Sequence, residues 1–149
     1  MSNIERFKIT HNVDMMTIDR RTHKIKMRKR FHNVLTTVGL RKMAELLMHE
    51  YTDAAFSIIA IGTNSTNASS ADTELGTLYS DEVATMEYEE TYNAVFSHEF
   101  SFTENVSIWE TGIFDSHGNM LNHAISDEEL EVDSETTLMV EIVINVASA

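Results

Sequence analysis

Hydrophobic and polar residues alternate along much of this chain. The pattern is clearest over residues 136–146, where every second residue is apolar: Leu138, Val140, Ile142, Ile144 and Val146. A period of two predicts a β-strand with one buried face. We also expect two extended segments within residues 4–31, of which 23–31 is the clearer and also alternates, a buried strand at 56–61, and strands at 83–92, 94–102, 106–114 and 120–125. We therefore expect most of the chain to be β.

One segment has a helical period instead. Its apolar residues recur three and four positions apart, at Leu40, Met43, Ala44 and Leu47. Thr36 or Thr37 can cap the first turn, because a threonine hydroxyl accepts a hydrogen bond from a free backbone N–H group. The sequence predicts one α-helix near residues 37–50, with this apolar stripe facing the core.

The connections between these elements are also recognisable. Residues 62–76 are rich in Ser, Thr, Asn and Ala without a strand or helix period, so we expect an exposed loop whose end is anchored by Leu75 and Leu78. Residues 115–119 contain Gly118 and predict a hairpin turn. Several short strands and one helix predict a mainly β protein, an antiparallel β-sandwich (jelly-roll-like) with a helix near residues 37–50 and an extended N-terminal arm.

Charge is divided unevenly along the chain. All 11 Lys and Arg residues lie in the first 42 positions beside 3 acidic residues, whereas residues 43–149 carry 21 acidic residues and no Lys or Arg. We therefore divide the chain into a basic arm, residues 1–32, and an acidic sandwich domain, residues 33–149. The net charge of −13 argues against nucleic-acid binding by the whole chain. Binding of nucleic acid by the basic arm stays open as an alternative.

Composition excludes several further classes. The chain has no cysteine, which excludes disulfides, thiolate metal sites and a cysteine nucleophile. We expect no signal peptide, because residues 1–30 are polar, and no membrane span, because no stretch approaches the roughly 18 apolar residues that one needs.

The basic and acidic segments suggest an interface. In residues 23–31 apolar residues alternate with a fully basic face, which is either solvated or covered by an acidic partner, since like charges along one strand repel each other. Residues 126–135 carry six acids and are a solvated face or loop, a docking strip for a basic strand, or a divalent-cation site. Our hypothesis is an assembly interface between copies of the chain, formed by Lys24, Lys26, Arg28, Lys29, Arg30, Glu128, Glu129 and Glu131.

Residues that carry chemistry are few and do not form a known motif. Asp72 and Glu74 have the oxygen ligands for a hard cation, but a solvated acidic loop is the simpler interpretation. Glu110 is expected to point inward and to brace the turn at Gly112 through hydrogen bonds, rather than to act in catalysis. His117 and His123 flank one hairpin and are close enough in sequence to meet across it. We predict no catalytic, cofactor-binding or metal-binding residues and no cofactor, and we do not expect an enzyme.

A set of short motifs, in a fixed order, is more specific. They lie at residues 33–36, 39–47, 59–66, 72–75, 109–115 and 118–123, and include Ile-Gly-Thr-Asn at 61–64 and Trp-Glu-Thr-Gly-Ile-Phe-Asp at 109–115. Over residues 33–146 the chain resembles a widespread group of small structural proteins of tailed bacteriophages. It departs from their pattern at Asn64, where Gly is common, and at His123, where Arg is frequent. Asn is tolerated because it also adopts left-handed backbone angles.

The resemblance implies a non-enzymatic virion protein with a β-sandwich body, assembled in the host cytoplasm. Its expected partners are other virion proteins and copies of itself, in a ring or trimer at the tail, baseplate, neck or capsid surface, including capsid decoration. We expect no membrane partner. A host-receptor or glycan-binding fibre module is an alternative, in which Trp109 and the tyrosines stack on sugars, although a single Trp on a strand is more often part of the core.

Overall fold

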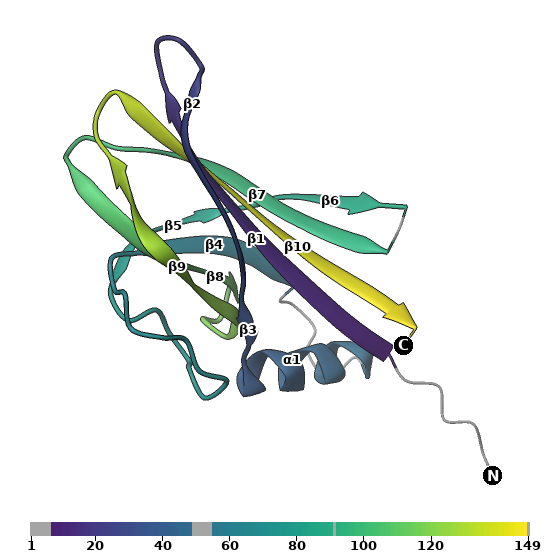
Figure 1. The fold of residues 1–149 in the computed structure, drawn as a ribbon. Coiled ribbons are helices and arrows are strands. Elements are labelled where there is room, and N and C mark those ends of the chain that lie inside the picture. Colours follow the sequence, from purple (N-terminus) through teal and green to yellow (C-terminus); the bar gives the residue numbers. More distant parts are fainter. Residues whose placement is uncertain (1–6, 49–54, 91, 149) are drawn as a thin grey trace.

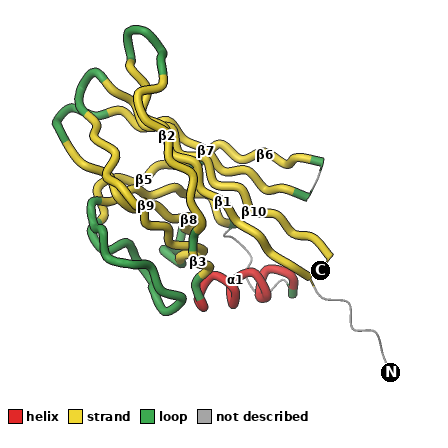
Figure 2. Tube along the Cα trace, viewed as in Figure 1, coloured by secondary structure: helices red, strands yellow, loops and turns green. Residues whose placement is uncertain are grey.

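Two antiparallel sheets and one helix form the structure. The computed structural model describes residues 7–48, 55–90 and 92–148 (Figure 1, Figure 2). The first sheet has the strand order β2-β1-β10-β7-β6 and consists of β1 (Phe7–Asp19), β2 (Ile25–His32), β10 (Thr136–Ser148), β7 (Asn93–Ser101) and β6 (Thr85–Glu89). The second has the order β3-β9-β8-β4-β5 and consists of β3 (Val34–Leu35), β9 (Met120–Val132), β8 (Val106–Asp115), β4 (Phe56–Gly62) and β5 (Leu78–Val83). The predicted mainly β, antiparallel sandwich with one helix is confirmed.

The hydrophobic core lies between the sheets. The alternating residues of β10 point into it, so that Leu138, Val140 and Ile142 are fully buried. Ile59 of β4 and Ile108 of β8, from the second sheet, belong to the same core cluster. Each large aliphatic side chain buried in this way contributes about 1.5–3 kcal/mol through the hydrophobic effect.

At two of the crossings between the sheets, a single residue connects the strands. Asn33 lies between β2 of the first sheet and β3 of the second, and Ala84 lies between β5 and β6. Both residues are buried, and the Ala84 N–H donates to the Ser57 carbonyl oxygen over 2.8 Å. The second of these crossings joins the β5 edge of one sheet directly to the β6 edge of the other.

The basic N-terminal segment is part of the first sheet from Phe7 onward. β1 pairs with β10 along its whole length, from Phe7 opposite Ser148 to Asp19 opposite Thr136, and β2 pairs with β1. β1 therefore lies inside the sheet and β2 forms its edge. The part of the predicted arm that precedes Phe7 lies outside the described residues.

The acidic stretch at 126–135 is largely a strand. β9 continues beyond the predicted end at residue 125 and reaches Val132, because Leu130 and Val132 supply a buried face. The exposed acids Glu129 and Glu131 alternate with these apolar residues. Of the two simple interpretations, residues 126–132 form a solvated strand face rather than a loop.

Helix α1 (Thr37–Leu47) starts where the sequence predicts, with Thr36 as its N-cap, and packs against β9. The predicted buried stripe is wrong at both ends, because Leu40 is 46% and Leu47 is 86% exposed. The buried residues of the helix are Gly39 and Lys42. No helix in the described ranges is long and apolar enough to cross a membrane.

Candidate functional site

A groove lies beside the β2 edge of the first sheet and the β9 strand of the second. Its volume is about 700 Å³, and its charged lining residues are Lys26, Glu128, Glu129, Glu131 and Asp133. Four of the eight residues that the sequence suggested for an assembly interface therefore line one groove of a single molecule. The arrangement follows from topology, because β2 and β9 border the same open side of the sandwich.

Lys29 links the two sheets near this groove. Its side chain lies on the inner face of β2, since its register partner on β1 is the buried Met15. The Lys29 Nζ atom is 3.1 Å from Glu128 Oε1 and 3.4 Å from Asp127 Oδ1. The hydrogen bond with Glu128 raises the pKa of Lys29 against the opposing effect of desolvation. Both acids are mostly exposed, so solvent screens this contact.

Arg28 and Arg30 lie on the opposite, outer face of β2 and share one carboxylate. Arg28 donates from Nη2 to Asp14 Oδ2 over 2.6 Å, and Arg30 donates from Nε to the same oxygen over 3.3 Å. Partial burial opposes ionisation of Asp14, but the two guanidinium groups outweigh it and lower the pKa of this carboxyl. Sequence reasoning missed Asp14, although the period of two along β1 is the signal that places it on the outer face.

The remaining predicted residue, Lys24, lies in the exposed turn between β1 and β2. Its carbonyl oxygen accepts a hydrogen bond from the Asp19 N–H over 2.9 Å. The predicted set is thus distributed over three places: the turn, the outer face of β2, and the side of the sandwich that contains the groove.

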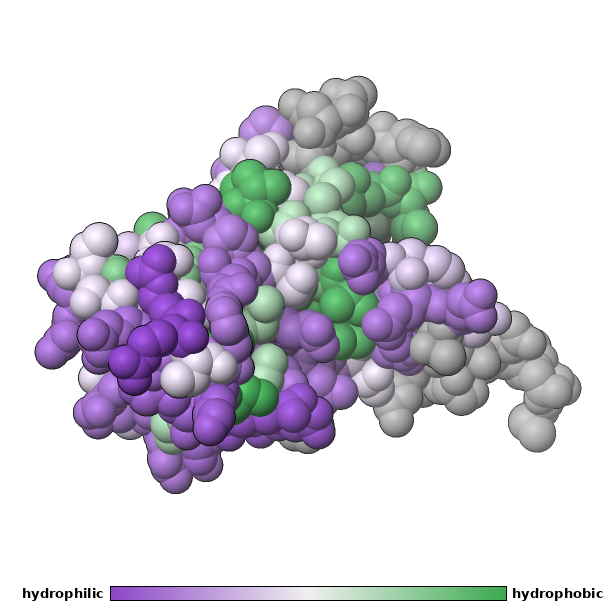
Figure 3. Space-filling model, turned by 90° about the horizontal axis from the view of Figure 1, so that it is seen from above, coloured by the Kyte–Doolittle hydropathy of each residue, from purple (hydrophilic) through white to green (hydrophobic). Residues whose placement is uncertain are grey.

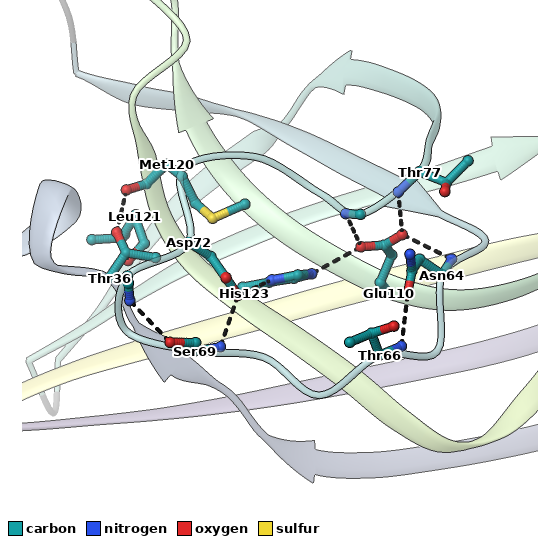
Figure 4. Close-up of polar contacts among 12 residues, drawn as sticks. Thr36, Asn64, Thr66, Ser69, Asp72, Thr77, Glu110, Met120, Leu121 and His123 are labelled. Carbon is teal, nitrogen blue, oxygen red and sulfur yellow. Dashed lines mark hydrogen bonds and ion pairs between the residues drawn. The ribbon is translucent and has the colours of Figure 1, made fainter.

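A second polar cluster lies under the loop between β4 and β5 (Figure 4). Glu110 of β8 is fully buried and accepts three backbone N–H groups of this loop, from Asn64 (2.8 Å), Gly76 (2.7 Å) and Thr77 (2.9 Å). These bonds, together with His123, outweigh the effect of burial and lower the pKa of Glu110. The predicted hydrogen-bonded role of this residue is correct, but it braces the 63–77 loop rather than the turn at Gly112.

A β-bulge explains the position of Glu110. The register of β8 against β9 shifts between Ile108 and Glu110. Ile108 and Ile113 both belong to the main core, although five positions separate them, so the alternation is reversed at the bulge. Glu110 therefore points out of the sandwich core and into the space that the loop covers.

His123 of β9 lies between two carboxylates (Figure 4). Its Nε2 atom is 2.8 Å from Glu110 Oε1, and its Nδ1 atom is 2.7 Å from Asp72 Oδ2. Burial opposes protonation, but the two carboxylates raise the pKa of His123 and its interactions lower the pKa of both acids. Two ionised carboxylates only accept hydrogen bonds, so both ring nitrogens donate and the ring is an imidazolium.

This ion cluster fastens the loop to the outer face of the second sheet. Asp72 also accepts the Ser69 N–H over 2.7 Å, and buried Leu75 packs on Ala60 and Met120. Leu75 therefore anchors the loop as predicted, whereas Leu78 is 57% exposed. His123 faces these acids rather than His117, which lies in the exposed hairpin turn. Among the described residues, no group of three or more His, Asp or Glu side chains is placed to hold a metal ion.

A buried ion pair fastens the helix in a comparable way. Lys42 Nζ is 3.3 Å from Asp115 Oδ2, and both side chains are at most 2% exposed. Asp115 also accepts the backbone N–H groups of His117 and Asn119 in the turn before β9, each over 2.9 Å. Burial opposes ionisation, but a hydrogen bond from the Asn119 side chain, the two backbone N–H groups and Lys42 lower the pKa of Asp115.

The buried ionisable groups thus hold loops and the helix in place, and both nitrogens of His123 are occupied. Trp109, the residue considered for sugar stacking, is half-buried on β8.

Comparisons with models of known protein families, with curated proteins and with solved structures find no match for this chain. The geometry of the chain itself is therefore the basis for an assignment of function.

Proposed function

We propose that this chain is a non-enzymatic structural protein of a tailed-phage virion, which assembles with copies of itself and with other virion proteins. The motif order over residues 33–146 supports the virion assignment. The role of the buried acids, His123 and Lys42 in fastening loops supports a structural protein over an enzyme. Tail, baseplate, neck and capsid surface all accommodate such a module.

One observation carries the proposal of assembly. The β1–β2 hairpin is strongly basic and extends past the neighbouring strands at one end of the sandwich (Figure 1), while residues 43–149 carry 21 acidic residues and no Lys or Arg. Seen from above, the most hydrophilic surface gathers on the side where this hairpin projects (Figure 3). Within one molecule, Lys29 reaches the acidic stretch of β9, whereas Lys24 and Lys26 stay exposed. Complementary charge of this kind orients association and speeds it.

The topology determines how assembly is tested. Deletion of residues 1–32 would remove both β2 and the internal strand β1, so a loss of assembly would only report unfolding. Charge reversal on the exposed hairpin avoids this problem. We expect the purified wild-type chain to form a defined oligomer in sedimentation velocity, and Lys24→Glu/Lys26→Glu to weaken it while circular dichroism shows that the variant remains folded. A wild-type chain that stays monomeric at all accessible concentrations refutes assembly through this chain alone.

The exposed hairpin also supports one alternative, contact with packaged nucleic acid. Arg20, Arg21, Lys24 and Lys26 are all exposed in or near its turn. Binding of this kind weakens steeply as salt increases, because neutralised phosphates release counterions. A gel-shift titration of the full chain with duplex DNA at two salt concentrations distinguishes the two functions, since assembly predicts no shift at physiological salt.

A further inference from the structure

The two edges of the first sheet carry opposite charges. β2 is one edge strand and β6 is the other. On the outer face of the sheet, β2 presents Arg28 and Arg30, whereas β6 presents Glu87 and Glu89. The strand registers place these residues on the same face. Residues directly opposite one another share a face, and one such row across the sheet consists of Arg30, Asp14, Glu141, Ser97 and Thr85. Glu87 and Glu89 follow Thr85 at every second position of β6 and therefore lie on that face too.

The inner faces of the same two strands match in hydrophobicity. On β2 the inner residues include Met27 and Phe31, which pack partly against the core. On β6 they are Met86 and Tyr88, which are 51% and 70% exposed. Two edge strands that pair side by side bring outer residues next to outer residues and inner next to inner. A β2 edge beside a β6 edge therefore places arginine near glutamate on one face and apolar side chains together on the other.

Every residue of β6 is exposed, including those on the face that would normally be buried. Exposed apolar residues on a sheet edge are a site where another strand adds. Charge restricts which strand that is. Two β6 edges would bring Glu87 and Glu89 against the same residues of a second copy, and two β2 edges would oppose their arginines, so like edges repel.

Strand directions agree with this restriction. Four antiparallel steps separate β2 from β6, so the two edge strands run in the same direction within one molecule. Consider a neighbouring copy that is related to the first by a rotation and whose first sheet faces the same way. Strand β6 of one copy then runs parallel to strand β2 of the other. An interface between two different edges repeats head to tail, and closes into a ring or extends as a filament.

We propose that the first sheet continues from one copy to the next, with the acidic edge strand β6 of one molecule added to the basic edge strand β2 of its neighbour. This inference rests on the proposed function, because it names the surfaces through which the chain self-assembles. It assigns the acidic partner of the basic strand to β6, rather than to Glu128, Glu129 and Glu131 of β9.

Site-directed cross-linking tests the pairing, and the chain suits it because it contains no cysteine. Ile25→Cys and Thr85→Cys place one thiol near the start of each edge strand, at exposed positions without charge. With a short bis-maleimide, we expect a mixture of the two variants, one of them tagged, to give the heterodimer. Each variant alone should give little dimer, and the double variant should give a ladder of higher oligomers. Dimers from either single variant alone would overturn the pairing.

Charge exchange is the second part of the test. We expect Arg28→Glu/Arg30→Glu and Glu87→Lys/Glu89→Lys each to weaken self-association at least about tenfold, which corresponds to about 1.4 kcal/mol. A chain that carries all four changes should associate with itself again, because both edges have exchanged sign. Circular dichroism and the melting temperature verify that each variant is folded.

Glu129→Lys/Glu131→Lys is the matched control, with the same change of charge on β9. It should leave association within about twofold of wild type, as expected for surface changes outside the interface. If Glu129→Lys/Glu131→Lys dissociates the oligomer and Glu87→Lys/Glu89→Lys does not, the β2–β6 pairing is refuted, but the proposal that the chain self-assembles is supported. If the wild type neither associates nor cross-links, both the pairing and the proposed self-assembly fail.

Discussion

The imidazole of His123 lies 2.8 Å from the carboxylate of Glu110, on the neighbouring strand and under a loop that both residues help to hold. The pair lies on the outer face of the second sheet, where a solvated surface would normally be expected. The loop excludes water from it and adds Asp72 on the other side of the ring. Because the protonated His123 ring lies between two carboxylates, attachment of the 63–77 loop depends on the protonation state of His123.

The pH dependence of stability follows from the directions of these pKa shifts. The folded pKa of His123 is raised above its ordinary value of 6.5, so its contribution is complete below pH 6.5 and is lost as the pH rises through the folded pKa. The pKa values of Glu110 and Asp72 are lowered from 4.5 and 3.8, so their contributions are complete above those values and are lost as the pH falls through the lower folded pKa values. The cluster therefore stabilises most between about pH 4.5 and pH 6.5.

Urea denaturation from pH 5 to pH 9 measures this effect. The free energy of unfolding should decrease above pH 6.5 in the wild type, and His123→Gln should remove most of that decrease. His117→Gln, at an exposed turn position, should retain the wild-type profile. A His123→Gln curve parallel to the wild type would show that the ring does not ionise within this cluster.

Replacement of Glu110 by Gln keeps the shape of the side chain and removes its charge. The amide group would direct a donor at His123 or at a backbone N–H of the loop, and the imidazolium would lose one partner. Removal of one member of a buried ion pair costs about 3–5 kcal/mol. We expect a loss of this size in the free energy of unfolding, together with faster proteolytic cleavage within residues 63–77.

Glu74→Gln is the control, because Glu74 is an exposed acid on the same loop. It should change stability by less than about 0.5 kcal/mol. Equal protease sensitivity of the Glu74 and Glu110 variants would mean that the carboxylate of Glu110 does not hold the loop.

Strand periodicity and turn chemistry predicted much of the fold. The alternation over residues 136–146, the cap at Thr36 and the turn at 115–119 each depend on nearby residues, and each is found in the structure. The site depends on contacts between distant residues. Glu110 meets Asn64 and Gly76 because of a bulge that reverses the alternation of β8, and a uniform period of two places Glu110 on the wrong face.

The buried face of the helix shows the same limit of local reasoning. Hydrophobicity selects Leu40 and Leu47 for the core, yet Gly39 and Lys42 are the buried residues. Position 39 requires glycine because the helix packs closely on β9, and a Cβ atom there would lie 2.6 Å from the Leu121 backbone. Lys42 is buried because it forms an ion pair with Asp115, which lies far away in the sequence. Neither reason is visible in the sequence of the helix.

Gly62 is expected to be intolerant of any side chain. A Cβ atom at this position would lie 2.4 Å from the Thr77 carbonyl oxygen and 2.6 Å from Glu110 Oε2. Gly62→Ala therefore requires the backbone of the loop to move away from the carboxylate that it binds. We expect a loss of about 2 kcal/mol or more in the free energy of unfolding, in the upper range of single substitutions.

Gly118→Ala separates steric from conformational effects. Gly118 has a φ of +84° and no heavy atom within 4 Å of a Cβ built there. Its replacement should cost about 1 kcal/mol through backbone strain alone. Thermal unfolding of the two variants should rank Gly62→Ala as the more destabilised, and the opposite order would refute a tight fit at Gly62.

Lys42→Met tests whether the buried ion pair holds the helix. The substitution retains the apolar part of the side chain and leaves the Asp115 carboxylate buried without its cation, at a cost of about 3 kcal/mol. Arg41→Met is the matched control, because Arg41 precedes Lys42 on the same helix and makes an exposed ion pair with Glu45. That pair contributes about 0.3–0.5 kcal/mol.

In urea denaturation, the free energies of unfolding of Lys42→Met and Arg41→Met should differ by more than about 2 kcal/mol. Similar small losses in both would mean that α1 is held by its cap and by packing on β9 rather than by the Lys42–Asp115 pair.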